Sequence, residues 1–270
     1  MSFDDYLKFF ATCMINSIDD NHELTSAPAS HEMNGHVFMT CDLDAGRHTF
    51  SASQIDKRMF PNNSGYSYSP CHLMLVKFKG SSLDYGFEYI QGNKGIKQRD
   101  ALIEADLSAG KYGFFVEMDW EEETESKNPN HEFQVTRYGP DGEDEFDDCT
   151  QDWTKHEVLS KIMYACCDGM KLEKEFDDAS NIKFYQDKND AGYDFTVVVN
   201  NEEEASIQVV REFIDGHGYT FQWPNLGETK FTLDVGPRET KVGIIKIHVM
   251  SFSTSIRAYE TVKMGDNQLI

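Results

Sequence analysis

The sequence predicts a mainly β protein: two antiparallel β-sandwich units with an N-terminal helix and a connecting helix. Apolar and polar residues alternate through many short segments, and this two-residue period is that of a strand with one buried face. Turn residues separate the segments at short intervals, which is typical of sandwiches. Helical spacing of apolar side chains is confined to residues 2–18 and 154–167.

The clearest part of the first sandwich is the stretch from Leu102 to Tyr138. Ile103 and Leu107 lie on one face of a strand whose other face is polar, and Gly110 allows a tight turn because glycine adopts positive φ at little cost. The apolar positions of the next two strands are Tyr112, Phe114, Val116 and Met118, then Phe133, Val135 and Tyr138. Further strands of this unit, which we place at residues 35–140, are expected at 37–40, 49–54, 71–78 and 85–90.

The first 34 residues are expected to form a helix followed by a linker. Residues 22–34 are rich in Ser, Pro, Ala and Asn, a composition typical of linkers. The helix before them carries an apolar stripe that needs a surface to pack on. The stripe, which is our candidate protein interface, consists of Tyr6, Phe9, Phe10 and Met14.

The second half begins with an acidic linker and helix at residues 141–180. The run Asp141–Asp148 (DGEDEFDD) is expected to be solvated, and a helix at 154–167 follows it. Residues 181–270 then predict a second sandwich-like unit. Its candidate strands are 193–199, 207–213, 219–223, 230–235, 242–249 and 255–262.

Charge and targeting signals limit the classes of partner and compartment. The net charge of −22, from 25 basic and 47 acidic residues, excludes a nucleic-acid binder, which needs a basic surface. It also disfavours an anionic membrane unless bound calcium offsets the charge. The N-terminus (MSFDDYLKFF) is unlike a signal peptide, and the six cysteines have no disulfide-framework spacing. We therefore expect a cytoplasmic protein with reduced thiols.

Calcium is the one cofactor for which the sequence offers ligands. Two acidic loops are expected at the ends of sandwich strands, and Ca²⁺ takes six to eight oxygen ligands. The candidate ligands are Asp42, Asp44, Asp119 and Glu121. The alternative is that these acids simply form solvated turns. A segment at Asp187–Gly192 imitates an EF-hand loop, but Val198 stands where the bidentate Glu belongs, which indicates a turn.

Catalytic chemistry has no clear support in the sequence. A nucleophilic cysteine needs a positive environment such as a helix N-terminus, whereas Cys13 and Cys166 fall late in their predicted helices. Paired zinc ligands such as CxxC or HExxH do not occur. We therefore expect no enzyme activity.

Residues 2–138 resemble the calpain family, in particular the C2-like β-sandwich (domain III type) that follows the protease core. SFDDYLKFFATCMI is similar to the segment that closes that core. NGHVFMTCDLDAGRHTFSASQIDKR resembles the first two sandwich strands, and RDALIEADLSAGKYGFFVEMDWE with HEFQVTRY resembles a later hairpin and strand, with His131 in place of a Gly. The papain-like core and the calcium-binding helical domain have no counterpart here. The resemblance therefore implies a calpain-like protein without proteolytic activity.

The leading hypothesis is a non-catalytic protein-interaction or structural module within a larger, cytoskeletal or ciliary, assembly. In the family, the N-terminal segment packs on a protease core that is missing here. Its apolar stripe then packs either on the chain's own sandwich or, the outcome that we favour, on another protein. One alternative is a calcium-responsive, C2-like regulatory or membrane-targeting module. Another is the regulatory part of a calpain-type protease whose core is encoded separately.

Overall fold

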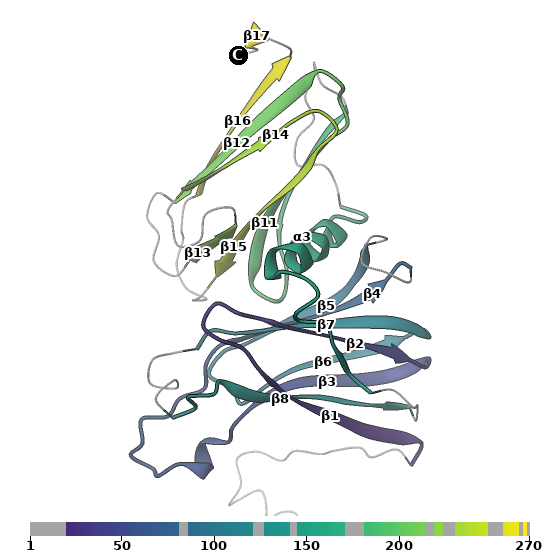
Figure 1. Ribbon diagram of the computed structural model, residues 1–270, viewed down its shortest axis with the longest axis vertical. Coiled ribbons are helices and arrows are strands. Elements are labelled where there is room, and N and C mark those ends of the chain that lie inside the picture. The colour runs from purple at the N-terminus through teal and green to yellow at the C-terminus, as the bar shows by residue number, and fades with distance from the viewer. Residues whose placement is uncertain are drawn as a thin grey trace, which may run out of the picture.

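The computed structural model describes residues 20–80, 86–120, 127–140, 145–170, 181–213, 219–223, 230–247, 256–264 and 267–268. It contains two β-sandwich units with a helix, α3 (Lys155–Cys166), between them (Figure 1). All strand pairs are antiparallel. The predicted fold class and connecting helix are thus confirmed. The helix expected at residues 2–18 lies outside the described residues.

The first sandwich consists of a four-stranded sheet in the order β1-β8-β3-β6 and a five-stranded sheet in the order β5-β4-β7-β2-β9. Its strands are β1 (His22–Ser30), β2 (Val37–Leu43), β3 (Gly46–Gln54), β4 (Cys71–Phe78), β5 (Phe87–Gly95), β6 (Asp100–Leu107), β7 (Gly110–Met118), β8 (Glu132–Pro140) and β9 (Asp147–Asp148). A short 3₁₀ turn, η1 (Lys57–Met59), follows β3.

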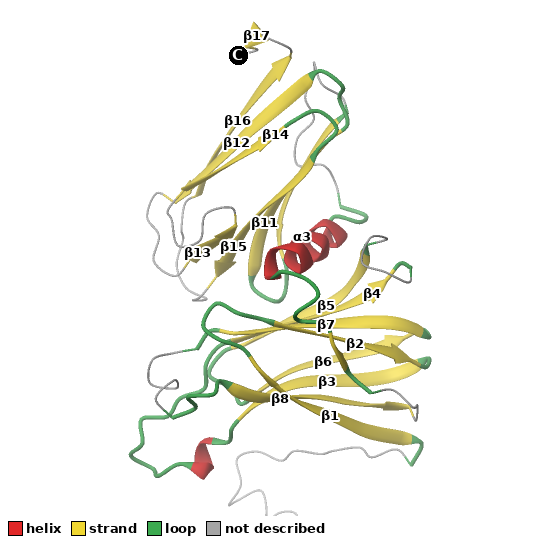
Figure 2. Cartoon of the chain, in the orientation of Figure 1, coloured by secondary structure: helices red, strands yellow, loops and turns green. Residues whose placement is uncertain are grey.

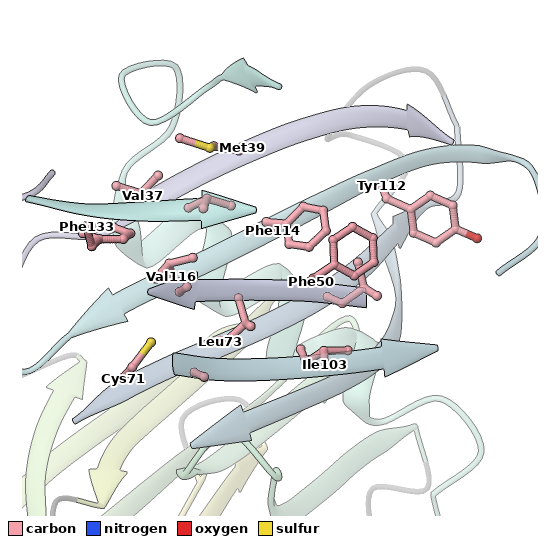
Figure 3. Close-up of a cluster of buried hydrophobic side chains, with 14 of the residues drawn as sticks. Val37, Met39, Phe50, Cys71, Leu73, Ile103, Tyr112, Phe114, Val116 and Phe133 are labelled. Carbon is pink, nitrogen blue, oxygen red and sulfur yellow. The ribbon is translucent and has the colours of Figure 1, made fainter. Parts of the chain in front are cut away.

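Large side chains from both sheets fill the space between them (Figure 3). The rings of Phe50 on β3 and Phe114 on β7 approach to 4.1 Å between centroids, and Leu73 and Ile103 are completely buried beside them. Along β3 and β6 the inward residues alternate with more exposed ones, as the sequence predicts.

Two segments expected to be linker belong to the first sandwich instead. Residues 22–30 form the edge strand β1, paired along its length with β8. Its inward residues, Ala27 and Ala29, are small, so the apolar alternation is faint in the sequence. Asp147 and Asp148, at the end of the acidic run, form the short strand β9 beside β2.

The second sandwich contains two four-stranded sheets, β10-β11-β15-β13 and β14-β12-β16-β17. Its strands are β10 (Ile182–Lys188), β11 (Tyr193–Asn200), β12 (Ala205–Phe213), β13 (Tyr219–Trp223), β14 (Lys230–Val235), β15 (Thr240–Ile247), β16 (Ile256–Met264) and β17 (Asn267–Gln268). Strand β10 was not among the predicted strands. The segment resembling an EF-hand loop is the turn between β10 and β11, as predicted, closed by the Gly192 N–H donating to Asn189 O at 3.2 Å.

Helix α3 lies between the two sandwiches (Figure 2). It begins at Thr154, whose hydroxyl caps the Glu157 N–H while the Glu157 carboxylate accepts from the Thr154 N–H, so two end groups are satisfied. Val158 and Ile162 are completely buried in a hydrophobic cluster to which both sandwiches contribute. The two units therefore share one core around the helix. Within the described ranges, none of the helices has the length and apolar composition that a bilayer-spanning segment needs.

Candidate functional site

Strand β7 is buried on both faces, and this places a carboxylate at the junction of the two sandwiches. Phe114, Val116 and Met118 point into the core of the first sandwich. Phe115, on the opposite face, packs in the cluster shared with the second sandwich. Glu117 lies on that same face by the two-residue period and is completely buried.

Glu117 accepts hydrogen bonds from three elements outside its own sheet. Lys155 on α3 donates to Oε1 at 2.7 Å, and Lys246 on β15 donates to the same oxygen at 2.5 Å. The Tyr193 hydroxyl on β11 donates to Oε2 at 2.5 Å. One carboxylate thus ties the first sandwich to the connecting helix and to two strands of the second. We call Glu117, Asp119, Lys155, Lys246, Tyr193 and His72 the junction cluster.

Asp119 and His72 form the second half of the junction cluster. Asp119 accepts from the ammonium group of Lys246. His72 on β4 is completely buried, with Nε2 3.0 Å from Asp119 Oδ2 and Nδ1 2.6 Å from the backbone oxygen of Ala191. Ala191 belongs to the turn between β10 and β11. Both ring nitrogens therefore face oxygen acceptors, one on each sandwich.

In the junction cluster, attraction between opposite charges offsets the free-energy cost of burying them. Burial alone would raise the pKa of Glu117, but Lys246 and Lys155 outweigh it and lower that pKa to about 2. Burial lowers the pKa of Lys155, whereas for Lys246 the attraction of Glu117 and Asp119 exceeds the burial effect and raises the pKa. Burial and the Glu117 charge raise the pKa of Tyr193, which keeps its hydroxyl a donor. At neutral pH Glu117 is therefore an anion with charged partners.

This arrangement suits a fixed joint better than a reaction centre. Glu117 has no accessible surface, and Lys246 and His72 are almost or completely buried. Removing one partner from a buried ion pair strongly destabilises a protein. Each partner of Glu117 therefore has to keep its position. The junction cluster therefore serves to hold the two sandwiches in one orientation.

The predicted calcium ligands do not come together. Asp42 lies opposite Lys111 at one end of β7, while Asp119 follows the other end of that strand. Asp119 is eight residue steps from Lys111, or about 26 Å along an extended strand, which is too far for Asp42 and Asp119 to share one ion. Asp119 is also engaged by Lys246 and His72. Glu121 lies outside the described residues, and Asp44 is exposed in the turn after β2.

No group of three or more His, Cys, Asp or Glu side chains in the described ranges is arranged to hold a metal ion. The predicted interface residues Tyr6, Phe9, Phe10 and Met14 lie outside those ranges. Burial raises the pKa of the Cys71 and Cys166 thiols and raises that of Cys167 to about 12, so these thiols stay protonated at neutral pH.

Sequence reasoning missed the junction cluster, although a signal for it exists. Glu117 interrupts the apolar run Tyr112–Met118, and Lys246 interrupts the apolar run Val242–Ile247. A charge within a strand that is apolar on both faces has to be paired when the strand is buried. When one such strand carries a Glu and another a Lys, the two side chains are expected to pair.

Comparison with known proteins adds no functional assignment. No protein-family model matches this chain, and no curated protein does. Among solved structures, the crystal structure of vicilin from Solanum lycopersicum (tomato) is 7% identical with a TM-score of 0.26, covering 93% of this chain and 76% of that one. A TM-score this low carries no argument, so the function has to be inferred from the geometry of the chain itself.

Proposed function

We propose that the protein is a non-catalytic, calpain-like module that binds other proteins within a larger cytoplasmic assembly, such as a cytoskeletal or ciliary one. The observation that carries this proposal is the junction cluster. It holds the two sandwiches in one orientation through a completely buried carboxylate, Glu117, and partners that are buried or half-buried. A rigid double sandwich of this kind suits the display of surfaces to partners.

The charge of the chain supports the same proposal. A net charge of −22 disfavours nucleic acid and anionic membranes and favours basic protein surfaces. The separation of Asp42 from Asp119 gives a calcium-responsive mechanism no support. We therefore do not propose calcium as part of the function.

The test compares partner capture by the tagged full chain and by a Phe9→Ser/Phe10→Ser variant. We expect the parent protein to retain a reproducible set of proteins from native lysate, and the variant to lose them with a nearly unchanged thermal midpoint, because the sequence predicts an apolar stripe there and apolar surface that a chain does not cover itself marks an interface. A large fall in the midpoint with capture intact would show that the stripe serves the protein's own fold. Thiol-sensitive cleavage of a fluorogenic peptide by the pure protein would overturn the non-catalytic assignment.

A further inference from the structure

The buried ring of His72 makes two contacts that a neutral histidine cannot satisfy together. Its Nδ1 lies 2.6 Å from the carbonyl oxygen of Ala191, and its Nε2 lies 3.0 Å from Oδ2 of Asp119. A carbonyl oxygen and an ionised carboxylate only accept hydrogen bonds. A neutral imidazole carries one N–H, whereas an imidazolium carries two. Both contacts are therefore hydrogen bonds only when both ring nitrogens are protonated.

The proton in the contact with Asp119 belongs to the ring rather than to the carboxyl group. The ammonium group of Lys246 donates to Oδ1 of the same Asp119 side chain. An ammonium donor stabilises a carboxylate relative to a carboxylic acid, because the attraction between opposite charges is lost when the acid is neutral. The geometry thus corresponds to an imidazolium that donates to a carboxylate on one side and to a carbonyl on the other.

The charges around the ring balance one another. Among the described residues, the titratable groups that face His72 or its carboxylate partners are Lys94 on β5, Glu117 on β7, Asp119 after β7, Asp190 in the β10–β11 turn, Tyr193 on β11, Lys246 on β15 and Lys155 on α3. Three of them are carboxylic acids and three are amines. The hydrogen-bond geometry, rather than an excess of either charge, therefore determines what the ring does.

Loss of one proton from His72 breaks the contact with the second sandwich. A hydrogen bond to a carboxylate is roughly twice as strong as one to a neutral carbonyl, so the remaining N–H stays with Asp119. The lone pair of Nδ1 then faces the carbonyl oxygen of Ala191, and two acceptors repel each other at that distance. Ala191 is completely buried in the β10–β11 turn, so its oxygen is left without this donor.

We propose that His72 is a pH-sensitive latch between the two sandwiches. Its imidazolium binds Asp119 in the first sandwich and the β10–β11 turn of the second, and its neutral form keeps the bond to Asp119 alone. Histidine ordinarily ionises between about pH 5 and 8, so the latch is closed on the acidic side of that range and opens as the pH rises. Glu117 and Tyr193 do not change charge there, because the pKa of Glu117 is lowered to about 2 and the pKa of Tyr193 is raised well above its ordinary value.

The test is a pH titration of the ¹⁵N-labelled full chain by NMR from about pH 5 to 9, a window set by the histidine range. Two-bond ¹H–¹⁵N spectra report the protonation of each ring nitrogen, and the His72 signals are those lost in His72→Gln. We expect both nitrogens to be protonated at the acidic end and Nδ1 to be the one that loses its proton.

The backbone amides of Gly192 and Tyr193 report the state of the turn, since both donate to Asn189 within it. Their chemical shifts should move with the same midpoint as the His72 ring. Their exchange rates, each divided by the rate of an unfolded peptide at the same pH, should rise about fivefold on deprotonation, the effect of one lost hydrogen bond. Neither change should occur in His72→Gln, which has no ring to titrate.

Asp119→Asn is a matched variant that should keep the latch closed at high pH. The Asn amide can donate to Nε2, so a neutral ring with its proton on Nδ1 satisfies both contacts. The Gly192 and Tyr193 amides should then remain equally protected across the titration.

Three results in the parent protein would overturn the proposal, whether or not the variants fold. The first is a neutral His72 ring that keeps its proton on Nδ1. The second is a ring that titrates while the Gly192 and Tyr193 amides do not respond. The third is a ring that stays in one protonation state throughout the range.

Discussion

Glu117 shows how a single buried charge defines the relation between two domains. Removing a carboxylate from water is costly, and in this protein Lys155, Lys246 and Tyr193 compensate the cost together. The compensation depends on geometry, because each partner belongs to a different element. A shift of either sandwich would leave a charge unpaired in an apolar surrounding, so the cluster selects one arrangement.

We expect Glu117→Gln to destabilise the protein by about 3–5 kcal/mol, because it leaves Lys155 without its carboxylate partner and Lys246 with Asp119 alone. Urea unfolding of parent and variant measures this difference. The control is Glu104→Gln, which breaks an exposed 2.8 Å pair with Arg47 and should cost less than about 1 kcal/mol. Similar losses in both variants would mean that the junction cluster contributes no more than a surface pair.

The pH dependence of stability should carry the signature of the same carboxylate. The pKa of folded Glu117 is about 2, below the usual 4.5, so its contribution is fully present above pH 4.5 and is lost as the pH falls towards 2. Urea unfolding of parent and Glu117→Gln at pH 6, 5, 4 and 3 gives the free energy of unfolding of each. The difference between the two free energies should be the same at pH 6 and 5 and smaller at pH 4 and 3. A difference that stays constant to pH 3 would contradict the depressed pKa.

At the residue scale, the sequence predicts which side chains are buried better than it predicts which charged side chains pair with one another. Ile103, Leu107 and Phe114 lie in the core, as their alternation with polar residues predicts. The junction cluster was not predicted, because Glu117 and Lys246 lie 129 residues apart and nothing local relates them. The separation of Asp42 from Asp119 was not foreseen either, because the sequence does not show which strand ends meet: Asp42 pairs opposite one end of β7, and Asp119 follows the other end.

At the scale of elements, helix α3 is the part of the fold that the sequence specified most fully. Its predicted range of 154–167 agrees with the observed cap at Thr154 and last helical residue Cys166. The strands that were missed, β1, β10 and the two-residue strands β9 and β17, all lie at sheet edges. An edge strand can remain stable with small or half-polar inward residues, as Ala27 and Ala29 show, so its pattern is weaker than that of a central strand.

A graded series in α3 should report how much of the stability depends on the helix. We expect Ile162→Val to cost about 0.5–1.5 kcal/mol and Ile162→Ala about 2–5 kcal/mol, since the side chain is completely buried in the shared cluster. Thr154→Ala should cost about 1 kcal/mol through loss of the capping box. Urea unfolding provides all three values. A negligible effect of Ile162→Ala would indicate that the helix is not part of the shared core.

At the scale of the whole molecule, the two sandwiches should behave as one cooperative unit. Phe38 and Phe115 from the first sandwich and Phe195 and Ile244 from the second lie in the same buried cluster around α3. The second sandwich also has its own core, with Phe184 and Val209 among its residues, so it could in principle unfold separately. Whether it does depends on the strength of the junction.

We expect calorimetry of the parent protein to show one transition whose van't Hoff and calorimetric enthalpies agree, because separation of the sandwiches would expose both the shared cluster and the junction charges. The double variant Glu117→Gln/Ile162→Ala weakens the polar and the apolar part of the junction together. It should resolve into two transitions, or give a van't Hoff enthalpy below the calorimetric one. As a control, Ala52→Gly, a change in the core of the first sandwich alone, should lower the midpoint while keeping a single transition. Two transitions in the parent protein would show that the sandwiches fold independently and that the junction cluster only orients them.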